Sequence, residues 1–532
     1  MTVRINNIRL SIDDDLSKLR KIAADLVGIK ANDIENFKIK KESIDARRKG
    51  KIDFIYQVEF NFDGEKKAAL KISNKDIVFF EEKNSSLIFG DTKLISRPVI
   101  IGSGPAGLFA GLVMAKYGYK PILLERGGAV DERSDKIKEF WEKGLLDTDS
   151  NIQFGEGGAG TFSDGKLTTR IKDKRCDYVL EEFVKHGAPS EIMYSFKPHI
   201  GTDILKNVVK NIRNKIIDLG GEVRFNSKVT DFKIKDGKII SIKVNDDYEI
   251  PSDVVIAAIG HSARDTFEVL FDKGVLFTQK PFAIGVRIEH LQSMIDERQY
   301  GKFANHPRLR AADYRLTYTS KKYNRPCYSF CMCPGGYVVA ASSEKEMVVT
   351  NGMSEYKRDS KNANSAIVVG VGPQDFQSNH PLAGIEFQRY YERLAFKAGG
   401  YDYMAPVQLI GDFLKDNLST KIGVVKPSYT RGYRFGKISD VLPDYVAQVL
   451  KEGLLDFDKK IKGFADYDAI LTGIETRTSS PVRIERDENC ECISIKGLYP
   501  AGEGAGYAGG IVSSAVDGIK VAENIMKKYA PI

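Results

Sequence analysis

Residues 98–126 read PVIIGSGPAGLFAGLVMAKYGYKPILLER, and this stretch decides the fold. It predicts a buried strand, a glycine-rich turn, an apolar helix and a second strand that ends in an acid. Gly102 allows the tight turn, Gly104 lets the backbone approach a pyrophosphate, and Gly107 lets helix and strand pack closely. Glu125 follows about 20 residues later, where the acid of such a unit bonds ribose hydroxyls. The unit therefore predicts a dinucleotide site at the amino end of the helix.

The identity of the dinucleotide follows from segments far downstream. Residues 253–261, DVVIAAIGH, read as a returning buried strand, and residues 497–512, GLYPAGEGAGYAGGIV, read as the closing element of the sheet. A nucleotide-binding sheet split by such long insertions resembles that of FAD enzymes related to glutathione reductase. In those enzymes a strand ends in Gly-Asp, and the acid bonds the ribityl chain or pyrophosphate; here the pair is Gly502-Glu503. The amino end of the helix expected from Ile511 would stabilise the negative charge of reduced flavin. FAD is therefore the predicted cofactor.

Length and composition agree with a large soluble enzyme. The chain has 532 residues, enough for two or three domains and an ample core. It carries 80 basic and 72 acidic side chains, a net charge of +8 spread along the chain, so no nucleic-acid partner is expected. We expect no transmembrane helix and no signal peptide. Six cysteines in so long a chain do not form a secreted disulfide framework, and a cytoplasmic location is expected.

Four segments are predicted from the order of these motifs. Residues 1–93 form a small α+β, ferredoxin-like domain that ends in a linker over 84–97. Residues 94–261 form the first part of the FAD domain, 262–484 an inserted substrate domain, and 485–532 the closing part of the FAD domain. The fold class is thus α/β: a Rossmann-like, three-layer FAD domain of glutathione-reductase type with an inserted α+β domain and a small amino-terminal α+β domain.

Local patterns support parts of this division. Val3–Leu10 reads as a strand, Leu16–Val27 as an amphipathic helix, and the strict alternation over 52–62 as a half-buried strand. The basic turn at 47–51 is compatible with binding of a partner or RNA, or with an ordinary solvated cluster on a capping or dimerising domain. Around Asp236-Gly237, alternating strands predict a β-meander over about 222–245, of which Val229 would contact the cofactor.

A second glycine-rich segment, NIQFGEGGAGTFSDGKL at 151–167, is expected to pass over the pyrophosphate and the isoalloxazine. Its backbone N–H groups and the Ser163 hydroxyl would help to cradle phosphate. Lys166 would stabilise negative charge on reduced flavin or bond N5; the alternative is a solvated lysine on a surface loop. Arg133 either pairs with the pyrophosphate or forms an ordinary ion pair on a helix surface.

The chain resembles one bacterial family of FAD-dependent dehydrogenases of about this length that share the extra amino-terminal domain. The residues that carry the resemblance are the segment 151–167, Cys331-Met-Cys333-Pro-Gly-Gly336, the segment 362–369 and Glu475-Thr-Arg477-Thr-Ser-Ser-Pro-Val-Arg483. The resemblance runs through the whole chain. It implies bound FAD and a fold like that of glutathione reductase, and it implies no substrate.

Several residues are candidates for chemistry beyond cofactor binding. Cys331 and Cys333 either exchange electrons with the flavin or are inert buried thiols. Arg477, just before the closing segment, either holds a substrate carboxylate or forms a structural ion pair. His261, directly after Gly260, would lie near the adenosine or flavin edge, unless it is structural.

Two further stretches are candidates for ligand binding. Basic residues between Arg308 and Arg325 either receive an anion or form a solvated hairpin face. The segment around Gly370 and Gly372 is read as a loop, so no separate nicotinamide domain is expected and NAD(P)H would bind transiently or not at all.

The sequence thus predicts an FAD-dependent oxidoreductase that transfers a hydride between flavin N5 and a small organic, anionic substrate. Two alternatives stay open: a non-catalytic flavin-binding sensor or RNA/protein partner acting through residues 1–93, and thiol–disulfide exchange through the two cysteines. No metal is expected, and the oligomeric state is unknown. The predicted catalytic residues are Lys166, Arg477, Cys331 and Cys333. The predicted cofactor-binding residues are Gly102, Ser103, Gly104, Pro105, Ala106, Gly107, Glu125, Arg126, Arg133, Gly157, Gly158, Ser163, Lys166, Val229, Gly260, Gly502, Glu503, Gly510 and Ile511.

Overall fold

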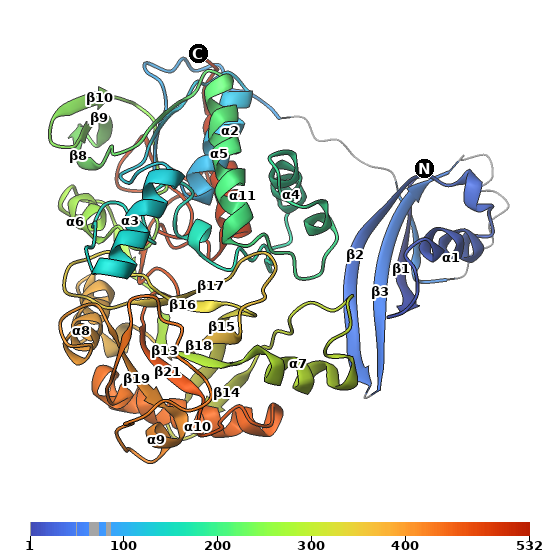
Figure 1. Ribbon diagram of the computed structural model, residues 1–532. Helices are drawn as coiled ribbons and strands as arrows, with labels where there is room; N and C mark the ends of the chain where they lie inside the picture. The colour runs from blue at the N-terminus through green and yellow to red at the C-terminus, as the bar shows by residue number, and fades with distance from the viewer. Residues whose placement is uncertain (1, 49, 63–73, 81–86) are drawn as a thin grey trace.

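The computed structural model describes residues 2–48, 50–62, 74–80 and 87–532 (Figure 1). A five-stranded parallel sheet lies at its centre, in the order β23-β11-β5-β6-β7. The strands are short and close together in space although they come from both ends of the chain. Their bounds are β5 Val99–Ile101, β6 Ile122–Leu124, β7 Glu222–Arg224, β11 Val255–Ala257 and β23 Leu498–Pro500.

This sheet is the middle of three layers, as expected. Alternate side chains face opposite ways, so Ile100 and Ile256 join the core under the helices, whereas Val99 and Val255 join the core under the β-meander. The helical layer consists of α2 Pro105–Lys116, α4 Arg175–Lys185, α5 Thr202–Asp218 and α11 Ile511–Lys528. The meander consists of β8 Val229–Lys235, β9 Lys238–Val244 and β10 Tyr248–Pro251, so it lies later in the chain than the predicted 222–245, whose first residues form β7 of the parallel sheet.

Two connecting helices flank these layers. Helix α3, Val130–Lys143, follows β6 and leads into the glycine-rich segment 151–167. Helix α6, Arg264–Asp272, packs Phe267 edge-on against Phe277, with a 5.9 Å centroid separation, in the same core as the meander. Its packing places α6 with the nucleotide-binding layers, although the expected boundary at residue 262 put it in the inserted domain.

The inserted segment forms a seven-stranded sheet in the order β14-β15-β18-β13-β21-β19-β20. Its strands are β13 Phe282–Leu291, β14 Thr317–Ser320, β15 Arg325–Cys333, β18 Asn362–Val371, β19 Ala405–Leu409, β20 Tyr433–Phe435 and β21 Ile470–Glu475. A short two-stranded sheet, β12 Phe277–Gln279 with β22 Val482–Ile484, leads the chain in and out. The elements around the sheet are α7 Gln292–Tyr300, α8 Ala383–Ala398, α9 Ile410–Leu414, α10 Asp444–Lys460, β16 Tyr337–Ala340 and β17 Thr350–Met353.

The two faces of this sheet differ in chemistry. Ile284 and Ile288 of β13 share a hydrophobic core with Leu450 of α10. The alternate side chain Arg287 points to the other face, where β17 covers it: a Cβ on Gly352 would lie 2.5 Å from Arg287 Nη1. The hairpin β14–β15 carries part of the basic stretch, which fits the interpretation as a hairpin face.

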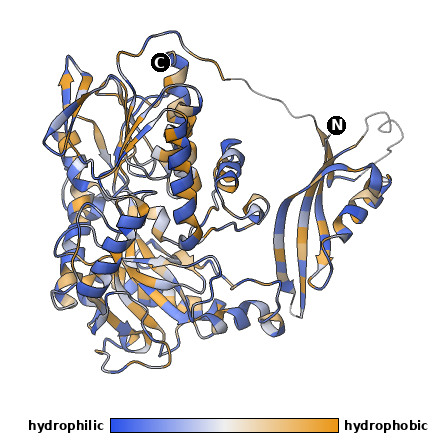
Figure 2. Cartoon of the chain, turned by 45° about the horizontal axis from the view of Figure 1, so that its top comes forward, coloured by the Kyte–Doolittle hydropathy of each residue, from blue (hydrophilic) through white to orange (hydrophobic). Residues whose placement is uncertain are grey.

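The amino-terminal domain is an antiparallel sheet with one described helix on it. Its elements are β1 Thr2–Ser11, α1 Lys18–Val27, β2 Glu35–Arg48, β3 Lys51–Asn61 and β4 Ile77–Phe80, with the strand order β2-β3-β1-β4. The strands predicted over 3–10 and 52–62 and the helix predicted over 16–27 are confirmed by β1, β3 and α1. Alternating orange and blue bands mark the half-buried strands in Figure 2. A second helix of a ferredoxin-like domain would fall in 63–73, which lies outside the described residues, as does the start of the expected linker.

Strand pairing and an arginine are among the contacts that hold this domain on the rest of the chain. The edge strand β2 pairs with the segment 194–196, where Glu42 N–H donates to Tyr194 O at 2.6 Å and Phe196 N–H donates to Glu42 O at 2.8 Å. The Arg308 guanidinium donates to Ile12 O at 2.9 Å and stacks on Phe54 at 4.4 Å.

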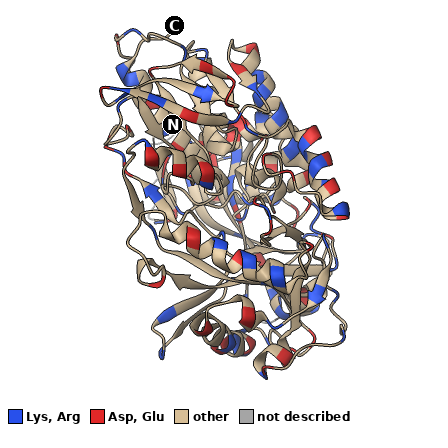
Figure 3. Ribbon diagram, turned by 90° about the vertical axis from the view of Figure 1, so that its left-hand side faces the viewer, with Lys and Arg blue, Asp and Glu red and all other residues tan. Residues whose placement is uncertain are grey.

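Charges on the molecule are paired and intermixed. In the basic turn, Arg47 pairs with Asp45 at 2.8 Å and Lys51 with Asp53 at 3.1 Å. Figure 3 shows acidic and basic residues interspersed along the helices of the face in view. Among the described residues, no helix has both the length and the apolar composition needed to cross a bilayer.

Helix α11 lies so close to α2 that only a glycine fits at Gly518. A Cβ there would come within 2.1 Å of Ala106 O, a backbone atom that cannot move aside. We expect Gly518→Ala to lower the free energy of unfolding by about 1–3 kcal/mol, because overpacking a rigid contact strains both helices. Gly111→Ala in α2 is the matched control, since its nearest neighbour is the flexible end of Ile216 at 3.4 Å. The control should be neutral or stabilising by up to about 1 kcal/mol in urea unfolding; equal midpoints for both variants would contradict the close contact.

Candidate functional site

Three glycine-rich segments that are far apart in the sequence meet at the carboxyl edge of the parallel sheet. Gly157 N–H donates to Ser103 O at 3.0 Å, which joins the second segment to the first turn. A Cβ on Gly158 would lie 2.9 Å from Gly104 Cα. A Cβ on Gly502 would lie 2.8 Å from Ala106 Cβ, which joins the closing segment to the start of α2. The expected convergence of the three segments is confirmed.

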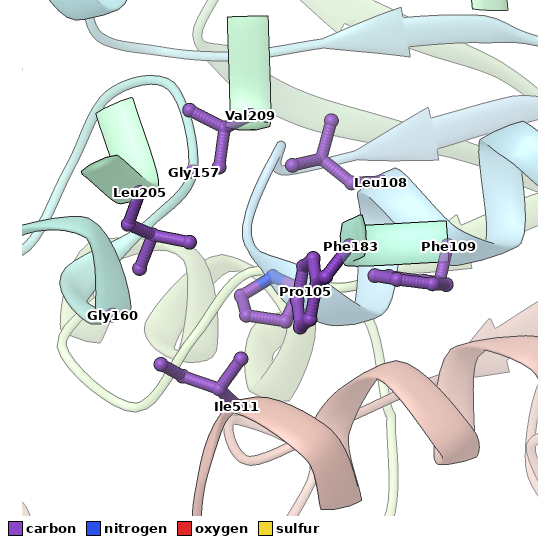
Figure 4. A pocket seen from close by; sticks show the side chains of 9 residues that line it. All are labelled: Pro105, Leu108, Phe109, Gly157, Gly160, Phe183, Leu205, Val209 and Ile511. Carbon is purple, nitrogen blue, oxygen red and sulfur yellow. The ribbon is translucent and has the colours of Figure 1, made fainter. Parts of the chain in front are cut away.

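A small apolar pocket lies at this meeting point and shows how the three segments face one another (Figure 4). Side chains from four helices and the glycine loop line it: Pro105, Leu108, Phe109, Gly157, Gly160, Phe183, Leu205, Val209 and Ile511. Pro105 and Ile511 begin α2 and α11, so the amino ends of these two helices open on the same space. The first N–H groups of a helix have no intrahelical acceptor, and both ends can therefore bind anionic or polar ligand atoms.

The backbone at this edge is open where a ligand would need to approach it. Around a Cβ built on Gly104 the nearest atom is Gly158 Cα at 3.8 Å, and around Gly260 and Gly509 no atom lies within 4 Å. Gly260 has a φ of +72°, a left-handed conformation that favours glycine. The site thus offers a line of bare backbone next to two helix amino ends, which fits a long ligand with a phosphate group.

His261 supplies the polar side chain of this cradle. Its Nδ1 lies 3.4 Å from the Glu503 carboxylate, whereas its Nε2 is buried and has no partner among the described residues. A buried ring nitrogen without a partner costs free energy unless a ligand or water bonds to it. Lys280 stands near Glu503, and burial lowers the pKa of this lysine. Hence His261 Nε2 and the open glycines together fit a flavin nucleotide.

Glu125 does not keep the role expected for it. Its Oε2 accepts hydrogen bonds from Ser103 N at 2.9 Å and from Ser103 Oγ at 2.7 Å. Its Oε1 accepts from Gly127 N at 3.1 Å and from Gly155 N at 3.0 Å. A carboxylate has about four acceptor sites, and all four are used. Instead of facing a ribose, the 4 % exposed Glu125 fastens the first turn to the second glycine-rich segment.

The pyrophosphate contact predicted for Arg133 is also wrong. Its side chain is fully buried and donates to carbonyl oxygens of the segment 151–158, including Asn151 O at 2.8 Å and Glu156 O at 2.7 Å. Burial lowers the pKa of Arg133 to about 9, although Glu125 and Glu156 favour its charged form. Arg133 therefore positions the glycine loop from beneath, and its guanidinium has no surface left for a phosphate.

Other predicted cofactor residues lie close to this edge with partners of their own. Arg126 makes a bidentate pair with Asp265 at 3.0 and 3.1 Å and stacks on Phe154. Ser163 closes a turn within its own loop, with Oγ donating to Gly160 O at 2.6 Å. Val229 is buried at the start of β8. Cofactor contacts at these three positions stay predictions.

Arg477 is a structural ion pair, so its predicted catalytic role is wrong. Its Nη2 lies 2.9 Å from Glu392 Oε2, and its Nη1 donates to Ser343 Oγ at 2.6 Å. Arg264 binds the same carboxylate at 2.8 Å. Although burial opposes ionisation, these two guanidinium groups hold the pKa of Glu392 well below its usual range. The network fixes α6 and α8 to the strand end at β21 rather than receiving a substrate.

Lys166 lies where the glycine-rich segment meets the inserted sheet, beside Asp164 at 3.7 Å. The same region holds Cys331, which is half-buried, and Cys333, which is fully buried. The structure therefore brings three of the four predicted catalytic residues together. The basic stretch, in contrast, is dispersed: Arg308 holds the amino-terminal domain, whereas Arg325 pairs with Asp375 at 2.6 Å.

Sequence reasoning missed Arg287, although a signal was present. Its position inside the apolar run FAIGVRIEHL of β13 requires a buried partner, because an unpaired buried charge is costly. The partner is Glu475, whose two oxygens each accept a hydrogen bond from Arg287 at 2.9 Å. The local sequence does not name that partner, which comes from β21. In the same way, the local sequence does not show that Asp164 pairs with Arg358, whose Nε donates to Asp164 Oδ1 at 3.0 Å.

Comparison with known proteins adds the family. Residues 281–478 match a family described as FAD-dependent protein, C-terminal domain-like, and residues 2–61 match a domain of unknown function. A Clostridium beijerinckii protein, described as an uncharacterized protein, is 57% identical over 530 residues, covering 99% of either chain.

Solved structures at low identity also match. The protein CtdE in complex with FAD is 14% identical and covers 80% of this chain and 82% of its own, with a TM-score of 0.30. A geranylgeranyl bacteriochlorophyll reductase-like protein from Thermoplasma acidophilum is 15% identical and covers 82% of this chain and 78% of its own, with a TM-score of 0.34.

The match to the Clostridium beijerinckii protein spans nearly all of both chains, and the inserted segment carries the domain of FAD-dependent proteins. The chain therefore belongs to the family of that bacterial protein and is an FAD-dependent protein.

Proposed function

We propose that this flavoprotein is an oxidoreductase that moves a hydride between FAD and a small organic anion. The observation that carries the proposal is the line of open backbone between two helix amino ends, with His261 Nε2 unpartnered beside it. The sheet order and the meander support a layout of glutathione-reductase type. When bound, FAD supplies two-electron chemistry at its N5 atom.

Different residues of the chain would bind different parts of the cofactor. The first-turn N–H groups of α2, with Gly104 keeping the backbone bare, would hold the pyrophosphate. The amino end of α11, which starts at Ile511, would favour negative charge on the ring system through its helix dipole. His261 Nε2 would hydrogen-bond a polar atom of the cofactor, while Glu503 holds Nδ1 and thereby orients the ring.

A substrate would bind where the glycine-rich segment faces the inserted sheet. Lys166 belongs to that segment and brings a positive charge to this side, which favours an anion. The segments 262–484 and 1–93 are proposed as the substrate and capping domains. NADH or NADPH would bind only transiently.

Gly104→Ala tests the cradle. We expect the bound FAD content to fall and the dissociation constant of FAD to rise at least tenfold, because the added methyl group occupies the path of the pyrophosphate. The apoprotein should unfold at an unchanged denaturant midpoint, since the new Cβ has 3.8 Å of room. Gly370→Ala, in the second glycine pair, is the control and should retain full FAD content.

His261→Ala tests the orphan ring nitrogen. Loss of one hydrogen bond to the cofactor should weaken FAD binding about tenfold, because such a bond contributes on the order of 1.4 kcal/mol. Titration of the apoprotein with FAD, followed by flavin fluorescence quenching, measures this directly. His380→Ala on an exposed surface is the control. An unchanged affinity in His261→Ala would place the cofactor away from this nitrogen.

Anaerobic reduction tests the reaction class. The purified yellow protein is photoreduced and then mixed with oxidised organic anions; separately, the oxidised protein is mixed with NADH and with NADPH. We expect reoxidation by at least one organic acceptor, seen as return of the flavin absorbance, and at most slow reduction by the nicotinamides. A flavin that no small molecule reduces or oxidises would favour the sensor alternative.

A further inference from the structure

The two cysteines of β15 lie at an irregularity in the inserted sheet. The register between β15 and β18 shifts between Phe330 and Cys333, and Cys331 within the shift has a φ of +43°. Left-handed backbone is uncommon for a residue other than Gly, Asn or Asp. The shift leaves Cys331 half-buried while Cys333 stays fully buried, with its Sγ donating to Cys331 O at 3.3 Å.

Positive charge gathers around Cys331 from two domains. Arg287 Nη1 donates to Cys331 O at 2.9 Å, and Lys166 approaches from the glycine-rich segment. The neighbouring Cys333 thiol, together with the charges of Lys166 and Arg287, holds the pKa of the Cys331 thiol well below its usual value, although burial opposes this. The same pairing and burial raise the pKa of Cys333, so the pair holds one thiolate and one thiol.

The surrounding charges do not cancel. Lys166, Arg287 and Arg358 face the two carboxylates Asp164 and Glu475, so one positive charge is left over. The imidazole of His199 adds no charge, because burial and the nearby Arg358 lower its pKa to about 4. A thiolate at Cys331 balances the cluster.

A second, independent feature lies beside the sulfur pair. Asn364 is fully buried and its Nδ2 has no hydrogen-bond partner among the described residues, whereas its Oδ1 accepts from Arg287 at 3.2 Å. A Cβ built on Gly352 would meet both Asn364 Oδ1, at 2.5 Å, and Cys333 Sγ, at 2.8 Å. The amide therefore lies next to the cysteines, and its buried Nδ2 lacks the hydrogen-bond partner that buried polar groups ordinarily have.

We propose that Cys331 is a nucleophile that accepts the R–S group of a small-molecule disulfide, R–S–S–R. The Cys331 sulfur attacks one sulfur of R–S–S–R, the bond between the two ligand sulfurs breaks, and the other half leaves as RS⁻. A mixed disulfide of Cys331 with R–S replaces the original disulfide, so electrons balance without a further oxidant. Cys331 is only partly exposed, which favours a small disulfide over the bulkier disulfide of a folded protein. This reactivity does not depend on the proposed hydride transfer.

The test uses the full-length holoprotein and 5,5′-dithiobis(2-nitrobenzoate) as the probe. We expect one thiol to react at pH 7 at least tenfold faster than any other, and peptide mass spectrometry to place the adduct on Cys331. Its rate should already be near its maximum at pH 7, since the reactive form is the thiolate. Cys176 is the internal comparison: it is also half-buried, but burial raises the pKa of its thiol.

Substitutions test which residues make the Cys331 thiol reactive. Cys331→Ser should abolish the fast phase and Cys176→Ser should retain it. Lys166→Met should slow the fast phase at least tenfold at pH 7 and much less at pH 10, whereas Lys166→Arg should keep most of the rate. The proposal is overturned if Cys331 reacts no faster than Cys176, or if the fast adduct maps elsewhere. If a variant misfolds, mapping the adduct on the unaltered protein still tests the proposal. The FAD content of each variant is measured separately and tests the cofactor site.

Discussion

The close approach of α11 to α2 governs the rest of the nucleotide-binding layers. Because Gly518 has no side chain, the last helix lies directly on Ala106 O, at the residue that follows the proline beginning α2. The amino ends of both helices are thereby fixed beside the same glycine turn, although Ile511 and Pro105 belong to opposite ends of the chain. Backbone packing of this kind leaves two sets of free N–H groups in one place, where both can bind anionic or polar ligand atoms.

Buried charges in this protein serve mostly to hold segments together. Arg133, Arg264 and Arg287 are among the largest fully buried side chains, and each meets carbonyl or carboxylate oxygens from distant parts of the chain. Removing one partner of such a pair is costly because the other charge then stays buried without compensation. These arginines therefore specify how the glycine loop, α8 and the inserted sheet fit together.

The parts predictable from sequence are those set by local chemistry. Two turns have backbone with positive φ: the turn at Gly102, whose φ is +99°, and the meander turn at Asp236-Gly237. Both can be predicted from a few residues, because glycine and aspartate favour this backbone conformation. The role of Glu125 could not be predicted, and the ion pair of Arg477 could be offered only as an alternative, because their partners, such as Gly155 and Glu392, lie far away in the sequence. The environment of Cys331 depends likewise on Lys166 and Arg287 from two other segments.

The pairing of β2 with the segment 194–196 has a consequence for solubility. The amino-terminal sheet has a long outer strand, Glu35–Arg48, whose unpaired backbone would otherwise be a template for addition of a strand from another molecule. The bonds of Glu42 to Tyr194 and Phe196 occupy the middle of that edge, and the opposite edge strand, β4, has 4 residues in the described part of the chain. Attachment of the small domain thus also protects it from edge-to-edge aggregation.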